Sequence, residues 1–242
     1  MNDQTDFTMH RIAIIRSCYP QRFGIPRQAG LVKSATATIV FEATHDNELA
    51  IRDIESFSHL WIVFVFHKQN YNGFKPLVQP PRLGGKKTVG VYASRSPNRP
   101  NPIGLSAVLL ERVEYTPTEI LLHIRAGDFL DGTPVLDIKP YIPFADSIAV
   151  ASSDWAESAE ATLPVEWSDL ALDELTAAEP DTTNATALQK LIEDTIALDP
   201  RPGHERSKDG REGQTWGMRF MHTDVKWQVT GGTARIVSVV VV

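Results

Sequence analysis

Short segments rich in isoleucine and valine, each bounded by turn-forming residues, constrain the fold more than any other feature of this sequence. Such residues suit the pleated surface of a β-sheet. Residues 60–66 (LWIVFVF) form an unbroken apolar run, which we expect to be a strand covered on both faces. Many short strands with turns between them predict a barrel or a sandwich over residues 8–146, not a doubly wound sheet. The expected strands are residues 11–16, 37–42, 60–66, 89–93, 105–115, 119–126 and 135–141.

Residues 147–242 predict a smaller α+β domain. Apolar side chains recur at helical spacing in residues 185–198, and Pro200 ends that helix. Gly231 and Gly232 form the turn of a hairpin. The small and acidic residues 147–166 are expected to be a loose connection. The strands expected in this domain are residues 216–221, 225–229 and 235–242.

Cys18 is the only cysteine in the 242 residues, which excludes an internal disulfide and a cysteine-rich zinc site. We interpret Cys18 as a small buried side chain, not as a nucleophile, because no nearby residue would activate it. No apolar run reaches the length of a membrane span, and the first residues do not resemble a secretory signal. We therefore expect a cytoplasmic protein without a membrane partner.

Charge is distributed unevenly along the chain, whose net charge is −6. Residues 145–200 contain thirteen acidic side chains and one lysine, a net charge of −12, whereas the segments on either side are each +3. Residues 56–110 contain no Asp or Glu but seven Lys and Arg. A surface built from that stretch would attract phosphate or carboxylate. The alternative is a solvated basic face with acids supplied by neighbouring elements.

Several motifs of common enzyme classes are missing. No Gly-x-Gly pair occurs, so the dinucleotide fingerprint is absent, and residues 84–88 lack the leading glycine of a phosphate loop. His-Glu-x-x-His and Gly-x-Ser-x-Gly are absent as well. These absences argue against Rossmann-type, P-loop, zincin and α/β-hydrolase functions.

Residues 94–106 are the segment most typical of a binding site. Arg95 and Arg99 lie on a proline-stiffened loop, and the planar arginine fork suits carboxylate or phosphate. The alternative is a structural loop with exposed arginines. The basic loop of residues 201–211 could likewise contact a nucleic-acid backbone or be a solvated linker.

Residues 128–141 form a second candidate segment. Asp131 and Gly132 mark a turn, and Asp137 and Lys139 then fall on one face of the following strand. These carboxylates could hold ribose hydroxyls or an ammonium group, or belong to a plain hairpin. On residues 58–68, alternation places His59 and His67 on one face, where they could line a pocket or be hydrogen-bonded core histidines.

The motifs taken together resemble the TsaA-like family. The resemblance rests on residues 26–30, 57–61, 80–85, 99–104 and 131–141 in the first part of the chain. Residues 198–202 and 224–227 resemble its C-terminal region. The match is dense from about residue 10 to residue 144 and patchy after residue 200.

The resemblance implies a methyltransferase with a β-barrel core that uses S-adenosylmethionine without a Rossmann fold. It also implies a homodimer with the cofactor near the subunit interface, and a tRNA substrate that has threonylcarbamoyl-adenosine beside the anticodon. The exocyclic nitrogen of that adenosine would receive the methyl group. A non-catalytic regulatory module that binds an adenosyl metabolite is the alternative.

Binding positions follow from the same resemblance. The family often has Gln after the histidine and Pro at position 29, so Lys68 and Ala29 are expected to contact the cofactor through their backbone. The expected cofactor contacts are Arg27, Gln28, Ala29, His67, Lys68, Arg95, Leu105, Asp128, Phe129, Leu130 and Asp131. The expected tRNA contacts are Lys86, Lys87, Arg99, Asn101, Lys139, Tyr141 and Arg201.

Methyl transfer to such a nitrogen requires a base, because the nitrogen is a poor nucleophile while it is protonated. Asp131, Asp137 and His67 are the candidates, and the sequence does not choose among them. Arg27 and Arg95 are candidates for holding the cofactor carboxylate or the threonyl carboxylate.

Overall fold

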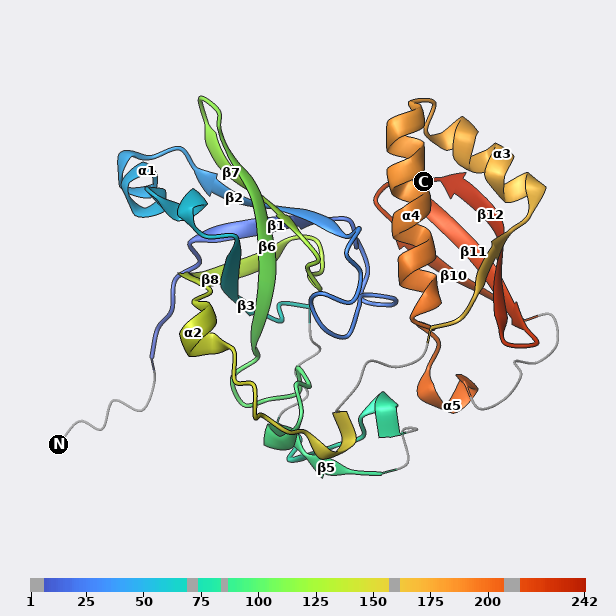
Figure 1. The fold of residues 1–242 in the computed structure, drawn as a ribbon, viewed down its shortest axis with the longest axis horizontal. Helices are drawn as coiled ribbons and strands as arrows, with labels where there is room; N and C mark the ends of the chain where they lie inside the picture. The colour runs from blue at the N-terminus through green and yellow to red at the C-terminus, as the bar shows by residue number, and fades with distance from the viewer. Residues whose placement is uncertain (1–6, 69–73, 84–86, 157–161, 207–213) are drawn as a thin grey trace.

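The computed structural model describes residues 7–68, 74–83, 87–156, 162–206 and 214–242. Its N-terminal part is a closed antiparallel barrel with the strand order β1-β2-β7-β6-β3-β8, in which β8 pairs back onto β1 (Figure 1). This confirms the prediction of a mainly β protein with an N-terminal barrel. The barrel strands are β1 Ala13–Ser17, β2 Thr36–Glu42, β3 His59–Val65, β6 Ile103–Tyr115, β7 Glu119–Arg125 and β8 Thr133–Pro140.

Side-chain alternation fills the barrel with apolar residues. On β3, Leu60, Ile62 and Phe64 are buried inside, while Trp61 and Val63 are partly exposed on the outer wall. The expectation that this run is covered on both faces is therefore wrong, because its outward face is partly exposed to solvent. A closed barrel has one interior, so alternate residues face outward.

The connection from β3 to β6 contains little regular structure. Only Val89 and Gly90 of the strand expected at residues 89–93 pair, as β5 with β4 Leu77–Val78, and η3 Val91–Ala93 follows at once. The 3-10 helix η2 Pro81–Leu83 lies between β4 and β5. The frequent prolines account for this, because proline cannot donate to a strand ladder.

Three short helices of the N-terminal part were not expected from the sequence. They are α1 His45–Ile51, η1 Ile54–Ser56 and α2 Pro143–Asp146. The Thr44 side chain caps α1 by accepting a hydrogen bond from the Asn47 amide at 3.2 Å. At seven residues or fewer, these helices are too short to produce an apolar period.

The C-terminal part is a four-stranded sheet in the order β10-β11-β12-β9, with helices against one face (Figure 1). Gly231 and Gly232, at φ of 56° and 78°, make the two-residue turn between β11 and β12 that the sequence predicts. The predicted helix is confirmed as α4, whereas α3 was missed. The elements are η4 Asp154–Ala156, β9 Val165–Trp167, α3 Asp169–Ala178, α4 Thr182–Ala197, α5 Gly203–Arg206, β10 Thr215–Phe220, β11 Thr223–Thr230 and β12 Thr233–Val241. The predicted loose connection therefore includes η4 and β9.

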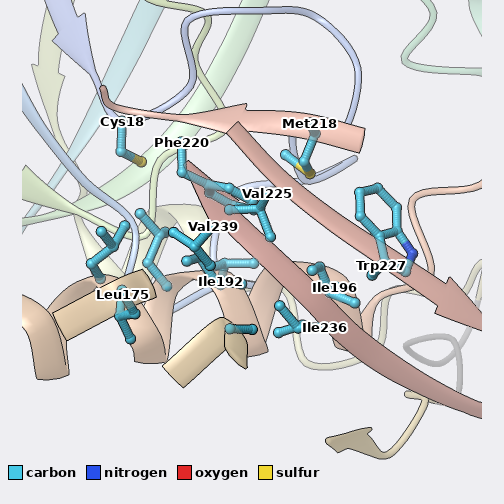
Figure 2. Close-up of a cluster of buried hydrophobic side chains, with 14 of the residues drawn as sticks. Cys18, Leu175, Ile192, Ile196, Met218, Phe220, Val225, Trp227, Ile236 and Val239 are labelled. Atoms are coloured by element: carbon cyan, nitrogen blue, oxygen red, sulfur yellow. The ribbon is translucent and has the colours of Figure 1, made fainter. Parts of the chain in front are cut away.

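A second apolar core lies between the sheet and the helices, and the barrel contributes to it. Cys18, Tyr19, Val32 and Ala35, from the connection between β1 and β2, are buried there with residues of α3, α4 and β10–β12. Figure 2 shows Cys18 beside Phe220 in this core. The loop that leaves β1 is thus packed into the C-terminal part. Within the described residues, no helix has the length and apolar character needed to cross a bilayer.

The interpretation of Cys18 as a buried small side chain is confirmed, and it makes a prediction. Burial raises the pKa of the thiol to about 12, so the neutral thiol dominates near neutral pH. Relative to the ordinary value of 9.0, the native protein should hold about a thousandfold less thiolate. Alkylation followed by mass spectrometry should show an inert Cys18 in native protein and rapid labelling in denaturant. Native labelling at the rate of a free thiol would contradict this placement.

Candidate functional site

Three connections of the barrel emerge at the same end. These connections are residues 18–35 between β1 and β2, residues 66–102 between β3 and β6, and residues 126–132 between β7 and β8. Antiparallel pairing around the barrel places the end of β1, β3 and β7 beside the start of β2, β6 and β8. Residues that are far apart in sequence therefore meet there.

A first group of site residues comes from all three connections. The Arg95 guanidinium donates a hydrogen bond to the Gln28 side-chain oxygen, and the Gly30 amide donates to the Ala126 carbonyl at 2.8 Å. Ser106, which points into the barrel from β6, donates its hydroxyl to Asp128 Oδ1 at 2.6 Å. The structure thus brings together Gln28, Arg95 and Asp128, three of the expected cofactor contacts.

Asp128 is a partly buried carboxyl group. Burial raises its pKa, while the Ser106 hydrogen bond, the charge of Arg95 and the Ala29 backbone oppose that rise. A carboxyl group in this position can accept hydrogen bonds from a ligand hydroxyl or ammonium group next to the Arg95 guanidinium.

A second group surrounds the Asp131–Gly132 turn. The Ser17 amide donates to Asp131 Oδ1 at 2.9 Å, and the Asp131 amide donates to the Tyr19 carbonyl at 2.8 Å. Gly132 has φ of 77°, and a Cβ built there would lie 3.9 Å from His67 Nε2. His67 therefore lies alongside the turn.

The pKa of His67 is lowered, chiefly by burial and then by the charge of Lys68. The Val65 backbone and the charge of Asp131 oppose this shift. The imidazole is consequently neutral near neutral pH and can accept a proton.

Buried aromatic rings of the barrel core pack against the β7–β8 turn. The Phe129 ring meets the Phe64 ring edge-on at 5.0 Å, and the Phe129 carbonyl accepts from Ser17 Oγ at 2.7 Å. A Cβ on Gly104 would lie 2.2 Å from the Phe64 ring, so a side chain at 104 would displace that ring. Phe129 and Leu130 are both buried, so the contacts predicted for these two residues would have to be made through their backbone.

Other predicted site residues lie on the outer wall of the barrel. The Asp137 carboxylate forms an ion pair with Lys139 Nζ at 2.8 Å, which confirms that the two side chains share a face. Asp137 and Leu105 lie on strands on either side of Val63 in the barrel register. Leu105 is 53% exposed there and faces away from Ser106 and Asp128.

The predicted tRNA contacts are dispersed. Arg99 Nη1 donates to the Ser94 carbonyl at 2.9 Å and to the Ser96 carbonyl at 3.3 Å, so it stabilises the loop around Arg95. Tyr141 packs against Trp61, with ring centroids 5.6 Å apart. Lys87, Asn101 and Lys139 are exposed, as is the predicted cofactor contact Lys68. Lys86 lies outside the described residues.

Arg201 does not lie on an exposed basic loop. It is 4% exposed and makes hydrogen bonds of 2.7 and 2.8 Å to the Asp199 carboxylate. This arrangement is that of a structural ion pair, and we do not retain Arg201 as a tRNA contact.

Two residues that support the site belong to no motif of the sequence. Ser17 and Tyr19 hold the Asp131 turn through backbone and hydroxyl groups. The only sequence signal for them is that they follow the predicted strand at residues 11–16. Two shallow hollows, around Asp53 and Ile54, lie at the opposite end of the barrel. No group of three potential metal ligands occurs among the described residues.

This geometry is that of a β-barrel protein whose polar site is assembled from the loops at one barrel end, without a glycine fingerprint. The model of the tRNA-methyltransferase O N-terminal domain matches residues 14–147, and the model of the TrmO C-terminal domain matches residues 160–242. The chain belongs to this TrmO family, which confirms the resemblance found in its motifs.

Individual relatives agree with this assignment. The chain is 40% identical over 227 residues to the tRNA (adenine(37)-N6)-methyltransferase of Escherichia coli (strain K12), covering 93% of this chain and 94% of the relative. It is 42% identical over 187 residues to the enzyme of the same name from Eikenella corrodens, covering 77% of this chain and 99% of the relative. The crystal structure of TrmO from Pseudomonas aeruginosa superimposes with a TM-score of 0.77 at 32% identity, covering 97% of this chain and 98% of that one.

The arrangement around His67 makes a prediction. Its pKa, measured by an NMR titration of the ring, should lie below the ordinary value of 6.5. Lys68→Met should raise that pKa, because it removes a neighbouring positive charge that disfavours protonation. Lys75→Met, at an exposed lysine farther along the same connection, is the control and should leave the titration unchanged. A pKa above 6.5, or no response to Lys68→Met, would be inconsistent with this environment.

Proposed function

We propose that this chain is an S-adenosylmethionine-dependent tRNA methyltransferase that methylates the N6 nitrogen of adenosine 37. The observation that carries the proposal is the meeting of Gln28, Arg95 and Asp128 at one barrel end, in a chain 40% identical over 93% of its length to the Escherichia coli enzyme. A Pseudomonas aeruginosa relative, 39% identical over 216 residues, bears a name that assigns it provisionally to the S-adenosylmethionine-dependent methyltransferases.

The residues present fit this cofactor. The Arg95 guanidinium suits the carboxylate of an amino-acid moiety, and the Asp128 carboxyl group suits ribose hydroxyls or the ammonium group. Arg27, Gln28 and Ala29 lie on the same loop, and the backbone of residues 128–131 borders the site. When bound, the cofactor supplies a methyl group on a sulfonium sulfur, which is a good leaving group.

In the proposed reaction, a bond forms between the adenosine nitrogen and the methyl carbon while the carbon–sulfur bond breaks. The nitrogen loses one proton, which a protein base accepts. His67 and Asp131 are adjacent at the site end of the barrel, and the lowered pKa of His67 keeps its ring neutral. We assign proton transfer to this pair. Asp137 lies on the outer wall in an ion pair with Lys139 and is not assigned to it.

The finer identity of the substrate is part of the proposal. A threonylcarbamoyl group adds a carboxylate to adenosine 37, and the acid-free stretch of residues 56–110 supplies cations without competing anions. Lys87, Asn101 and Lys139 are exposed and suited to tRNA phosphates. Arg99 supports this surface through its bonds to the loop carbonyls, so its contribution to tRNA binding would be indirect.

We further propose a cytoplasmic homodimer. An apolar patch on the outer wall of the barrel, made by Trp61, Val63 and Leu105, supports self-association, as does Phe144, which is 92% exposed in α2. A tRNA substrate and a single buried thiol suit the cytoplasm. We also propose that residues 8–146 form a cofactor-binding barrel and that residues 147–242 form a tRNA-contacting domain.

The test is methyl transfer from labelled S-adenosylmethionine to tRNA isolated from a strain that lacks this gene. We expect label in tRNA that has the threonylcarbamoyl group and none in tRNA without it. Asp131→Asn should lower kcat about a hundredfold or more, because it weakens the proton-accepting pair. Asp137→Asn is the matched control and should retain kcat within about twofold.

The outcomes separate the competing functions. Cofactor binding without transfer to any tRNA would support the regulatory module and contradict the enzyme. Equal labelling of both tRNA preparations would keep the enzyme and reject the threonylcarbamoyl requirement. A large loss in Asp137→Asn with none in Asp131→Asn would reverse the assignment of the base.

A further inference from the structure

The connection between β1 and β2 has no regular secondary structure over residues 18–35, yet it presents Gln28 and Ala29 to the site. Ordering a loop of this length costs conformational entropy, so contacts elsewhere must hold it. We call residues 18–35 the cofactor loop. On the side away from the site, the loop packs into the C-terminal core.

Both ends of the cofactor loop are anchored in the C-terminal core. Cys18 and Tyr19 at one end, and Val32 and Ala35 at the other, are at most 3% exposed and belong to that core. The Met221 amide donates to the Cys18 carbonyl at 2.9 Å.

The middle of the loop lies directly on the C-terminal sheet. The Phe23 ring is stacked with the indoles of Trp216 and Trp227, at centroid distances of 6.5 and 6.2 Å. Gly24 follows with φ of 88°, and a Cβ built on it would lie 2.2 Å from the Met218 side chain. A side chain at position 24 would therefore displace the Met218 side chain of β10, three residues before Arg27.

Tyr19 contacts both the site turn and α4. Its hydroxyl shares a buried 3.1 Å hydrogen bond with Thr195 Oγ1, and its carbonyl accepts from the Asp131 amide at 2.8 Å. At the far end of the loop, Ser34 Oγ donates to Asp194 Oδ2 at 2.7 Å. These contacts join α4, the cofactor loop and the proposed base.

We propose that the C-terminal α+β part positions the cofactor loop, with Tyr19 and Phe23 as positioning residues for S-adenosylmethionine binding. The inference rests on the proposed function, because it assumes that Gln28 and Ala29 contact this cofactor. Weakening the anchors populates loop conformations that do not bind, and the apparent Kd rises in inverse proportion to the fraction that does. Once the cofactor is bound, the loop is ordered again, so kcat at saturating cofactor changes little.

The experiment compares Tyr19→Phe and Phe23→Ala with the parent protein by titration calorimetry with S-adenosylmethionine and by steady-state methyl transfer. We expect Kd and KM for the cofactor to rise about fivefold or more, with kcat within about twofold. Phe23→Tyr retains the ring and should restore the parent Kd. Tyr19→Phe removes a single hydroxyl, so it tests the inference even if Phe23→Ala does not fold.

The control is Ile236→Val, in the same core but on β12, two strands from the edge strand β10 on which the loop lies (Figure 2). It should lower the Tm without changing Kd. An unchanged Kd in folded Tyr19→Phe and Phe23→Ala would overturn the inference and leave the proposed function standing. An equal rise of Kd in the Ile236→Val control would have the same consequence. Absence of binding by the parent protein overturns both.

Discussion

Closure of the antiparallel barrel is the constraint on which the rest of the structure depends. The six strands pair in an order that returns β8 to β1, and their interior is filled by apolar side chains such as Ile15, Leu60 and Ile62. A ligand cannot enter a small barrel that is packed in this way, so binding groups must lie on its loops. The same closure brings three connections to one end, where Gln28, Arg95 and Asp128 meet although their positions in sequence differ widely.

Sequence alone predicts the elements and many of the residues, but not their partners. Six predicted strands form the barrel because β-branched residues and alternation mark them locally, and the same alternation places Asp137 beside Lys139. The outward face of β3, the ion pair that buries Arg201 and the carbonyls that bind Arg99 depend on tertiary neighbours. No local pattern encodes those neighbours. Ser17 and Tyr19 were missed for the same reason, since their roles arise from the turn that packs against them.

The two halves of the chain share the work of building the site. The barrel supplies the rigid frame, the Asp128–Asp131 turn and Arg95, while the cofactor loop leaves the barrel and packs into the C-terminal core. This arrangement explains why a loop of eighteen residues without regular structure can present Gln28 at a defined place. The acidic segment, residues 145–200, therefore has a structural role, because its helices α3 and α4 form one side of the core that holds the loop.

Hydrogen exchange of the parent protein with and without S-adenosylmethionine would show whether the three connections form one binding site. We predict added protection of amides in residues 27–30, 94–96 and 127–132 together, because all three connections meet at the cofactor. Residues 52–57 and 116–118, at the opposite end of the barrel, should exchange as before. Protection confined to that opposite end, or to only one of the three connections, would contradict this prediction.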